Sequence, residues 1–479
     1  MAYTVVIIGG GAVGTLTARE LSRYSCTVLL LEKNHDVASG SSKANSGIAH
    51  AGFDAKPGTA KAFFNVRGSR MMEGVCKDLG VHYKRNGSMV LAFNDGENEV
   101  LRELLRQGAE NGVCGLSLIS GEEARGMEPA LSGEVKHALL AETGGIVCPY
   151  SLTSNAAENA AINGVTIKRS AEVKNIRKRD GLFIISTTAG EFAGRYVINA
   201  AGLYAGDIAG LAGDHSLRIT PRRGEYMLFD KKSGGIVSHT IFQTPDKLFG
   251  KGVLVTPTVD GTLLVGPNAV NLGEGGREAD ETTAGGQEDI WTRALKSVPG
   301  IRRSDLITSF AGLRAVAEGD DFITGWSETV PGLLNAAGIQ SPGLTASPAI
   351  AQYLAGLINE SENGLRPNPA FNPRLKKRAA IPELSGEDLN TLISDDPAYG
   401  NIICRCETVS EGHIVESIHR KCGAVDIDGV KRRTRAGMGR CQGGFCMPRV
   451  LEIIARENGK SFTEITKKDD GSYILTGER

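Results

Sequence analysis

The stretch VVIIGGGAVG at residues 5–14 decides the fold class of this chain. Residues 5–8 are apolar on both faces, which is typical of a buried parallel strand. Residues 15–24 favour a helix, and residues 27–31 form a second apolar strand that completes a βαβ unit. The pattern predicts an α/β protein with a doubly wound, Rossmann-like sheet.

The glycines of this stretch match the spacing G-x-G-x-x-G. Gly9 allows a tight turn, Gly11 lets the backbone approach a pyrophosphate, and Gly14 lets the helix pack on the strand. Glu32 closes the second strand, where its carboxylate can accept hydrogen bonds from both ribose hydroxyls. The motif predicts a dinucleotide at a helix N-terminus, without separating FAD from NAD, and a plain glycine-rich turn is the alternative.

Three further features favour FAD. The chain contains no second G-x-G-x-x-G motif for NADH, so electrons would enter from a small substrate. Residues 39–52 are dense in small hydrogen-bonding side chains that can cradle an extended dinucleotide, although a flexible loop has the same composition. Two glycine-rich turns offer close backbone approach farther along the chain. The candidate cofactor contacts from these segments are Ser41, Ser42, Asn45, Ser46, Gly202 and Gly338.

Length and composition limit the functional classes. The chain has 479 residues, 41% hydrophobic and 23% charged, which indicates a soluble globular protein of about three lobes. Its formal net charge of −1 argues against an electrostatic grip on nucleic acid or anionic membrane. No apolar run approaches the ~18 residues of a membrane span. We expect a cytoplasmic protein, with peripheral contact at the inner face of the cell membrane left open.

The pattern along the chain predicts three units. Residues 1–360 form the dinucleotide-binding oxidoreductase unit, with cofactor-binding parts near 1–80, 145–215 and 325–360. A mostly antiparallel β substrate lobe, near 81–144 and 216–324, is inserted in it, and hairpin turns are expected at Asp180-Gly181 and Asp260-Gly261. Residues 361–400 are a linker or wrapping arm. Residues 401–479 form a small helical domain, in which Thr408 and Glu411 predict a capping box for a helix over 409–420, and another helix follows Pro448.

Oxidising an alcohol requires an acceptor for the hydroxyl proton, and a histidine suits that role near neutral pH. His50 lies in the candidate flavin-contacting segment and is the candidate base, with a structural histidine as the alternative. Arg314 ends an expected strand and can clamp a carboxylate or phosphate with two bonds. Arg223 and Lys251 are weaker candidates for anion binding.

Four cysteines near the C-terminus are candidate metal ligands: Cys404, Cys406, Cys441 and Cys446. Four thiolates can bind zinc or a [2Fe-2S] cluster, and the short C-x-C pair together with an adjacent redox unit favours the cluster. Cys422 is not expected to be a ligand. A basic run at Lys431, Arg432, Arg433 and Arg435 would favour the reduced cluster; a nucleic-acid role lacks the interleaved aromatic residues.

Residues 1–360 resemble the D-amino-acid-oxidase-like family of FAD enzymes. The motif NSGIAHAG at residues 45–52, followed by KPG at 56–58, is similar to the L-2-hydroxyglutarate dehydrogenases. The resemblance implies non-exchangeable FAD, a β-rich lobe over the flavin and hydride transfer from substrate to flavin. It also implies that Val173 holds the adenine through backbone atoms, while Gly343, Leu344 and Thr345 lie near the pyrimidine end of the ring.

The C-terminal tail resembles the bacterioferritin-associated-ferredoxin-like [2Fe-2S] domain. Residues 432–443, RRTRAGMGRCQG, are similar to the tail of anaerobic glycerol-3-phosphate dehydrogenase large subunits. This implies oxidation of sn-glycerol 3-phosphate to dihydroxyacetone phosphate, with electrons leaving through the cluster to a partner subunit or quinone-linked acceptor. Asp54 stands where those enzymes usually carry an arginine, so L-2-hydroxyglutarate is the alternative substrate. A non-catalytic electron-transfer subunit and a zinc-bearing scaffold are the other hypotheses.

Overall fold

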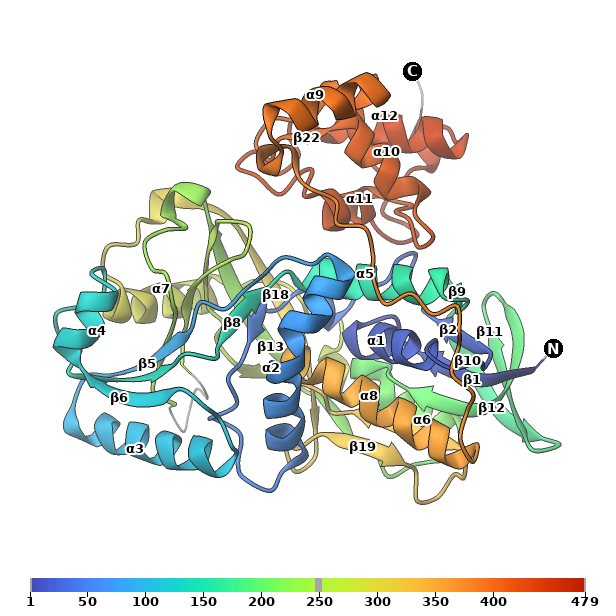
Figure 1. Cartoon of the computed structure of the whole chain (residues 1–479), viewed down its shortest axis with the longest axis horizontal. Coiled ribbons are helices and arrows are strands. Elements are labelled where there is room, and N and C mark those ends of the chain that lie inside the picture. Colours follow the sequence, from blue (N-terminus) through green and yellow to red (C-terminus); the bar gives the residue numbers. More distant parts are fainter. Residues whose placement is uncertain (1, 246–251, 478–479) are drawn as a thin grey trace.

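Two β-sheets covered by helices form the body of the protein, and a small helical domain sits above them (Figure 1). The computed structural model describes residues 2–245 and 252–477. Over these residues, no helix combines the length and the apolarity needed to cross a bilayer.

The first sheet carries the predicted βαβ unit. Its strands in spatial order are β10 (Val173–Arg179), β11 (Leu182–Thr187), β12 (Gly190–Asn199), β1 (Ala2–Ile8), β2 (Val28–Leu31) and β9 (Thr166–Lys168). β20 (Leu333–Ala337) pairs in parallel with β12, and β19 (Ile323–Trp326) pairs with β20. α1 (Ala12–Leu21) joins β1 to β2, and these two strands pair in parallel. The predicted α/β, Rossmann-like class is confirmed, with the first helix beginning and ending earlier than expected.

Both faces of β1 are buried, which explains its uninterrupted apolar sequence. Val5 and Ile7 pack with residues of α1 and α8 (Gly343–Ser361), whereas Val6 and Ile8 pack with Phe183 on the opposite face. Burial of each such side chain contributes about 1.5–3 kcal/mol. The other helices of this part of the protein are α2 (Ala60–Leu79), α5 (Pro149–Ile162) and α6 (Ala205–Leu211).

The second sheet is mostly antiparallel, as predicted. In spatial order it contains β17 (Val270–Asn271), β13 (Ile219–Phe229), β16 (Leu263–Val265), β15 (Val255–Pro257), β14 (Thr240–Gln243), β5 (Ser88–Ala92), β7 (His137–Ala141) and β6 (Leu116–Ser120). β5 and β14 pair in parallel. The ninth strand, β18 (Leu306–Ala317), runs antiparallel along the whole of β13. The helices of this part are α3 (Asp95–Glu110), α4 (Gly121–Met127) and α7 (Ala284–Ser297).

The two predicted hairpin turns are confirmed. Asp180 and Gly181 join β10 to β11 with φ of 52° and 78°, the left-handed conformations that a two-residue hairpin requires. Asp260-Gly261 lies between β15 and β16, which pair antiparallel. A third, small sheet contains β3 (Ile48–Ala49), β8 (Gly145–Val147) and β4 (Tyr83–Lys84). β3 and β4 precede β5 in the sequence, and β8 follows β7.

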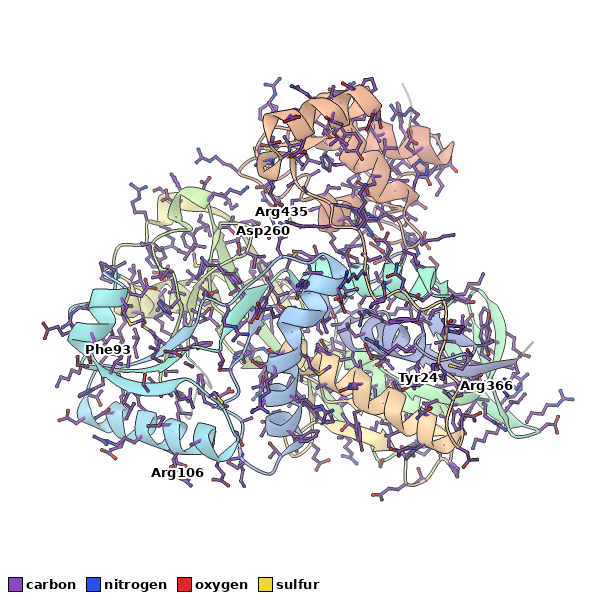
Figure 2. The ribbon with its side chains drawn as sticks, in the orientation of Figure 1. Tyr24, Phe93, Arg106, Asp260, Arg366 and Arg435 are labelled. Carbon is purple, nitrogen blue, oxygen red and sulfur yellow. The ribbon has the colours of Figure 1, made fainter. Side chains whose placement is uncertain are left out.

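After α8, the chain passes across the surface of the first unit. The backbone N–H of Ser25 donates to the Arg366 carbonyl at 2.8 Å, and Tyr24 and Arg366 lie close together in Figure 2. The N–H of Asn368 donates to the Arg23 carbonyl at 2.7 Å. α9 (Gly386–Asp395) then leads into the C-terminal domain.

The C-terminal domain has its own apolar core, with residues from Cys404 to Ile465. It contains β21 (Ile402–Cys404), β22 (Val409–Ser410), α10 (Glu411–His419), α11 (Ile427–Thr434) and α12 (Met447–Asn458). The expected helix near Pro448 is confirmed as α12. The predicted capping box is wrong: the Ser410 hydroxyl caps α10 by accepting the His413 N–H. Thr408 instead has a left-handed φ of 52°, in the turn between β21 and β22.

Candidate active site and cluster site

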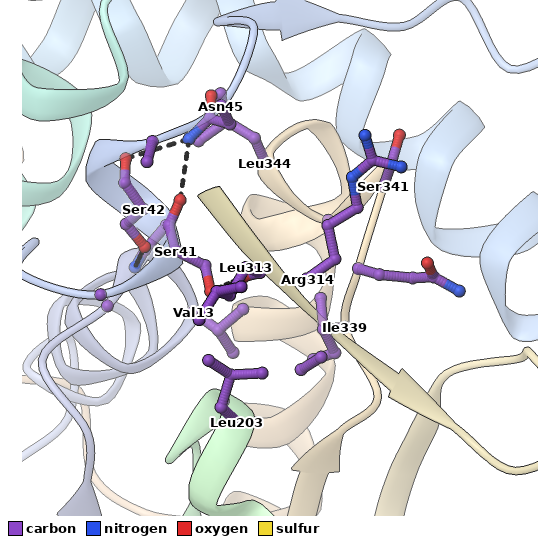
Figure 3. Close-up of a pocket in the computed structure, with 18 of the residues that line it drawn as sticks. Val13, Ser41, Ser42, Asn45, Leu203, Leu313, Arg314, Ile339, Ser341 and Leu344 are labelled. Atoms are coloured by element: carbon purple, nitrogen blue, oxygen red, sulfur yellow. Dashed lines mark hydrogen bonds between the residues drawn. The ribbon is translucent and has the colours of Figure 1, made fainter. Parts of the chain in front are cut away.

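A cavity of about 650 Å³ is lined by residues from both large sheets (Figure 3). It runs past the glycine-rich turn, residues 40–50, the start of α8 and the pair β13–β18. The cavity brings together most of the predicted cofactor and substrate residues. These are Gly9, Gly11, Glu32, Ser41, Ser42, Asn45, Ser46, His50, Val173, Gly202, Arg314, Gly343 and Leu344.

Three predicted contact residues lie behind the cavity wall rather than in it. A Cβ on Gly14 would lie 2.0 Å from the Gly9 carbonyl oxygen, so this glycine permits helix–strand packing, as expected. A Cβ on Gly338 would lie 2.5 Å from the Ala317 Cβ, so the packing here requires a glycine, and its cofactor contact stays a prediction. Thr345 is fully buried, and its hydroxyl forms hydrogen bonds with the backbone of Ile48 and His50.

The glycine-rich turn leads into the N-terminus of α1. Gly11 is the N-cap of α1 and has no side chain to cap the first turn. Glu32 is buried, and one carboxylate oxygen accepts the Gly10 N–H at 2.7 Å while the other accepts the Asn34 N–H at 2.9 Å. Burial raises the pKa of Glu32. The carboxylate thus orders the turn and the loop after β2 at the same time.

The serine-rich segment after Glu32 is held against the second sheet by hydrogen bonds. The Asn45 side-chain amide donates to the carbonyls of Ser41 and Ser42 at 3.2 Å and 3.0 Å (Figure 3). The Ser41 hydroxyl donates to the Leu313 carbonyl at 2.5 Å. The Ser42 hydroxyl accepts the Ala12 N–H at 2.9 Å, at the start of α1. The segment is therefore a shaped wall of the cavity, joined to both sheets.

Two arginines face each other across strands at the other end of the cavity. Arg222 on β13 pairs in register with Arg314 on β18, and both line the cavity. Arg222 donates to the Asn271 side chain at 2.7 Å, and Arg314 donates to the Asn268 carbonyl at 3.3 Å. A Cβ on Gly224 would lie 2.7 Å from an Arg314 guanidinium nitrogen, so the glycine makes room for that group.

Arg222 was missed by sequence reasoning, which selected its neighbour. Arg223 is buried away from the cavity and forms ion pairs with Glu225 and Glu281, so its predicted anion-binding role is wrong. Alternation along β13 places Arg222 and Arg223 on opposite faces, and this period-two signal could have identified Arg222. The other weaker candidate, Lys251, lies outside the described residues.

Further side chains of the cavity wall were also missed: Lys61, Tyr226, Phe242 and Asp320. Lys61 donates to Asp320 at 2.8 Å. Asp54, which replaces the arginine expected from the glycerol-3-phosphate enzymes, lines the cavity as well. The end of the cavity with Arg222 and Arg314 therefore combines cations with nearby carboxylates.

His50 is positioned through its backbone. Its N–H donates to the Thr345 hydroxyl at 2.9 Å, and that hydroxyl donates to the Ile48 carbonyl at 3.1 Å. The His50 ring lies 5.8 Å from the Phe242 ring, centroid to centroid. A ring nitrogen in a cavity with two guanidiniums can accept a proton from the hydroxyl of an anionic substrate.

The four candidate cysteines form two pairs. The Cys406 and Cys441 sulfurs lie 3.8 Å apart. Cys404 and Cys446 share a hydrogen bond, which lowers the pKa of Cys404 to about 6 and raises the pKa of Cys446. Backbone N–H groups of Phe445 and Gly443 lower the pKa of Cys441.

Two pairs of cysteines are the ligand set that a [2Fe-2S] cluster requires. Among the described residues, no group of three His, Cys, Asp or Glu side chains is placed to hold one metal ion. A tetrahedral zinc site needs four ligands around one centre, whereas a [2Fe-2S] cluster has two irons that share four thiolates. Cys422 is buried beside Val37 and Ala157, consistent with its exclusion as a ligand.

The basic run before Cys441 is used mainly to attach the C-terminal domain. Arg432 and Arg433 bond to Asp36 of the first unit. Arg435 pairs with Glu407, next to Cys406, at 2.9 Å and with Asp260 of the second sheet at 2.6 Å (Figure 2). Arg435 is therefore the member of this run that lies between the cysteine loop and the body.

Comparisons with known proteins identify two families in this chain. A family model described as FAD dependent oxidoreductase matches residues 4–357, and one described as BFD-like [2Fe-2S] binding domain matches residues 402–456. The chain is 48% identical over 478 residues to a glycerol 3-phosphate dehydrogenase from Caloramator mitchellensis, covering 99% of this chain and 98% of that protein.

Two other relatives are more distant. An FAD-bound L-alpha-glycerophosphate oxidase structure from Mycoplasma pneumoniae matches with a TM-score of 0.74 and 32% identity, covering 78% of this chain and 98% of that one. The human mitochondrial L-2-hydroxyglutarate dehydrogenase is 30% identical over 413 residues, covering 75% of this chain and 89% of that protein. The chain belongs to the FAD dependent oxidoreductase family, and its cofactors are FAD and a [2Fe-2S] cluster.

Proposed function

We propose that this enzyme oxidises sn-glycerol 3-phosphate to dihydroxyacetone phosphate and delivers the electrons to a partner protein. The observation that carries the proposal is the cross-strand pair of Arg222 and Arg314 in the cavity that also contains His50. The 48% identity to a glycerol 3-phosphate dehydrogenase over almost the whole chain supports the same substrate.

Two opposed arginines favour a strongly anionic ligand. Side chains directly opposite on antiparallel strands lie close together, and like charges in such positions destabilise the sheet. A phosphate between the guanidiniums would turn this repulsion into attraction, because each can donate two parallel bonds to it. We therefore assign the phosphate of the substrate to Arg222 and Arg314.

The proposed reaction removes a hydride from C2 of glycerol 3-phosphate and a proton from its hydroxyl. We propose that the His50 ring accepts that proton, while the bond between Thr345 and the His50 backbone holds the ring in place. When bound, FAD supplies the acceptor for the hydride. The predicted contact residues that line the cavity, from Gly9 to Leu344, are proposed to hold FAD.

Cys404, Cys406, Cys441 and Cys446 are proposed to hold the cluster. When bound, a [2Fe-2S] cluster supplies one-electron transfer. A partner protein is proposed as the electron acceptor. A reducing, cytoplasmic setting is proposed because five of the nine cysteines lie in the last 76 residues, which is not the pattern of a secreted disulfide framework.

L-2-hydroxyglutarate is the second candidate substrate. It is favoured by Asp54, which lines the cavity at the position where glycerol-3-phosphate enzymes of the family usually carry an arginine. The 30% identity to the human L-2-hydroxyglutarate dehydrogenase agrees with this alternative.

A substrate test under anaerobic conditions separates the two. The purified enzyme is mixed with each compound, and bleaching of the flavin absorbance is followed. We expect bleaching by sn-glycerol 3-phosphate at lower concentrations than by L-2-hydroxyglutarate. The reverse order would assign the second substrate, and bleaching by neither would reject both. Metal analysis of the same sample should give iron without zinc.

A further inference from the structure

We infer that the exposed side of the cysteine loops is a docking surface for an acidic electron-accepting protein. We call this surface the exit patch, and it comprises Arg405, Cys406, Arg440, Phe445 and Arg449. The inference rests on the proposed function only in that electrons leave through the C-terminal domain.

The cysteine pairs differ in exposure, which gives the site a direction. Cys404 and Cys446 are 1% and 2% exposed, in the core of the domain. Cys406 is exposed and Cys441 is half-buried. Since electron transfer weakens steeply with distance, an acceptor that docks over Cys406 and Cys441 reaches the site by its shortest path.

Phe445 makes this side of the domain unusually apolar. Its side chain is 85% exposed, the highest value among the exposed large hydrophobic residues of the described chain. Its backbone is held in place, because its N–H lies at the Cys441 sulfur. An exposed aromatic side chain next to a redox site is the type of residue that anchors protein interfaces.

Three arginines surround Phe445 and the outer cysteine pair. Arg405 lies between two of the cysteines and is exposed. Arg440 is 67% exposed and pairs with Asp230 at 2.8 Å. Arg449 is 59% exposed and pairs with Glu452 at 2.9 Å. Exposed ion pairs of this kind are weak, so both guanidiniums can turn to a partner.

The carboxylates near these arginines are less exposed than the arginines themselves. Asp230 is 16% exposed and Glu452 is 46% exposed, against 67% and 59% for their partners Arg440 and Arg449. Glu407 follows Cys406, but its side chain is only 3% exposed and it pairs with Lys231 and Arg435. The arginines also offset the negative charge that four thiolates bring to the same side. An apolar centre with a basic rim fits a partner whose own surface is acidic.

The attachment of the domain leaves the exit patch accessible. Arg432 and Arg433 on α11 bind Asp36, and these three side chains are 8%, 1% and 1% exposed. The exposed residues of the exit patch lie on the cysteine loops and the start of α12. Arg440 is a patch residue that also pairs with the body, at Asp230. The buried pairs of α11 with Asp36 can hold the domain on the body when Arg440 turns to a partner.

Two haem proteins of opposite charge test the inference. The soluble domain of cytochrome b5 is the acidic probe, and cytochrome c is the basic probe. The full-length holoenzyme is reduced with dithionite, excess reductant is removed, and haem reduction is followed by stopped flow. Binding of the oxidised proteins is measured separately by calorimetry. Because dithionite replaces the substrate, the outcome is independent of which hydroxy compound the enzyme oxidises.

We expect cytochrome b5 to bind more tightly than cytochrome c, and we expect both its binding and its reduction to weaken as salt rises from about 20 mM to about 200 mM. F445A and R449E should each reduce rate and affinity about tenfold, as expected for interface anchors. Iron content and the electron paramagnetic resonance signal of the reduced cluster should stay unchanged. The matched controls are F462A, with an aromatic residue 44% exposed in the same domain, and R102E, at 61% on α3. Both controls should behave as the wild type.

Equal or tighter binding of cytochrome c would overturn the inference, as would the absence of transfer to cytochrome b5. Wild-type rates and affinities in F445A and R449E would also overturn it. Light scattering tests whether a second copy of this chain occupies the patch. A wild-type dimer that F445A dissociates would show that it does, and would overturn the inference. Failure of glycerol 3-phosphate to bleach the flavin would remove the proposed function and leave this result standing.

Discussion

Arg433 of the C-terminal domain holds Asp36 of the first unit in a two-bond ion pair, with nitrogen–oxygen distances of 2.6 Å and 2.7 Å. Arg432 adds a third bond to Asp36 at 2.8 Å. Asp36 lies in the loop that begins at Glu32, and Glu32 lines the dinucleotide cavity. The same loop therefore contacts the FAD cavity on one side and the cluster domain on the other.

Substitution of Asp36 tests this connection. D36N would leave two buried guanidiniums without their carboxylate, and breaking a buried pair costs about 3–5 kcal/mol. We expect a lower thermal midpoint, faster loss of flavin and cleavage by protease within residues 361–400. Thermal unfolding followed by flavin fluorescence measures the first two. D180N makes the same change at a carboxylate that is 87% exposed and should match the wild type.

The same ion pairs predict a pH dependence. Burial opposes ionisation of Asp36, but the Arg433 and Arg432 guanidiniums outweigh it and hold the pKa of Asp36 well below its usual range. The unfolded carboxyl has a pKa of about 3.9, so the pair stabilises the fold above that pH and is lost as pH falls further. If the thermal midpoint of D36N fell with decreasing pH by as much as that of the wild type, this assignment would be contradicted.

Local patterns were sufficient for much of the fold and part of the site. The βαβ unit and the turn at Asp180-Gly181 depend on residues adjacent in sequence, and they were predicted correctly. The cavity lining follows from the same local motifs. Ser410 replaced Thr408 as the helix cap because the turn at Thr408 is left-handed, which the cap pattern alone does not reveal.

The missed features depend on contacts between distant segments. Arg222 faces Arg314 only because β13 and β18 pair in one particular register. Thr345 supports His50 across nearly three hundred residues of sequence, and Arg433 meets Asp36 across nearly four hundred. Alternation can place Arg222 on one face of its strand, but no periodicity or spacing in the sequence encodes its partner in a distant segment. For the same reason, the basic run was assigned to the cluster instead of the domain junction.

Substitutions of the two adjacent arginines on β13 should have different effects, one on substrate binding and the other on thermal stability. R222A removes a charged group from the cavity, and loss of a hydrogen bond to a charged ligand costs about 1.5–3 kcal/mol. We expect KM for the substrate to rise about tenfold to a hundredfold, with flavin content unchanged. R223A instead leaves the buried Glu225 without its neighbouring cation, so it should lower the thermal midpoint and spare KM. Steady-state kinetics and thermal unfolding of both variants would reject the assignment if the effects were exchanged.

Thr345 should act on catalysis through His50. T345V keeps the shape of the side chain but removes the hydroxyl that bonds the His50 N–H and the Ile48 carbonyl. Leaving such buried groups unpaired costs about 1–3 kcal/mol, and the His50 ring should lose its alignment. We expect a fall in kcat about tenfold or more, with a smaller change in KM, and recovery in T345S. A change confined to KM, or no recovery with serine, would show that Thr345 does not position His50.

Asp426 should make the attachment of α11 sensitive to alkali. Its carboxylate caps the helix by accepting the Gly429 N–H at 2.6 Å, and burial raises the pKa of Asp426 to about 7. The unfolded group has a pKa of about 3.9, so the folded state keeps a proton that the unfolded state has lost. Stability from this group is complete below that lower pKa and is lost as pH rises through about 7.

D426N keeps a capping oxygen without a titrating group. Its thermal midpoint should therefore gain on the wild type between about pH 5 and about pH 8, as the proton is lost from the wild type alone. D396N makes the same change at an exposed cap and should show no such gain. Parallel curves for D426N and the wild type over this range would contradict the prediction.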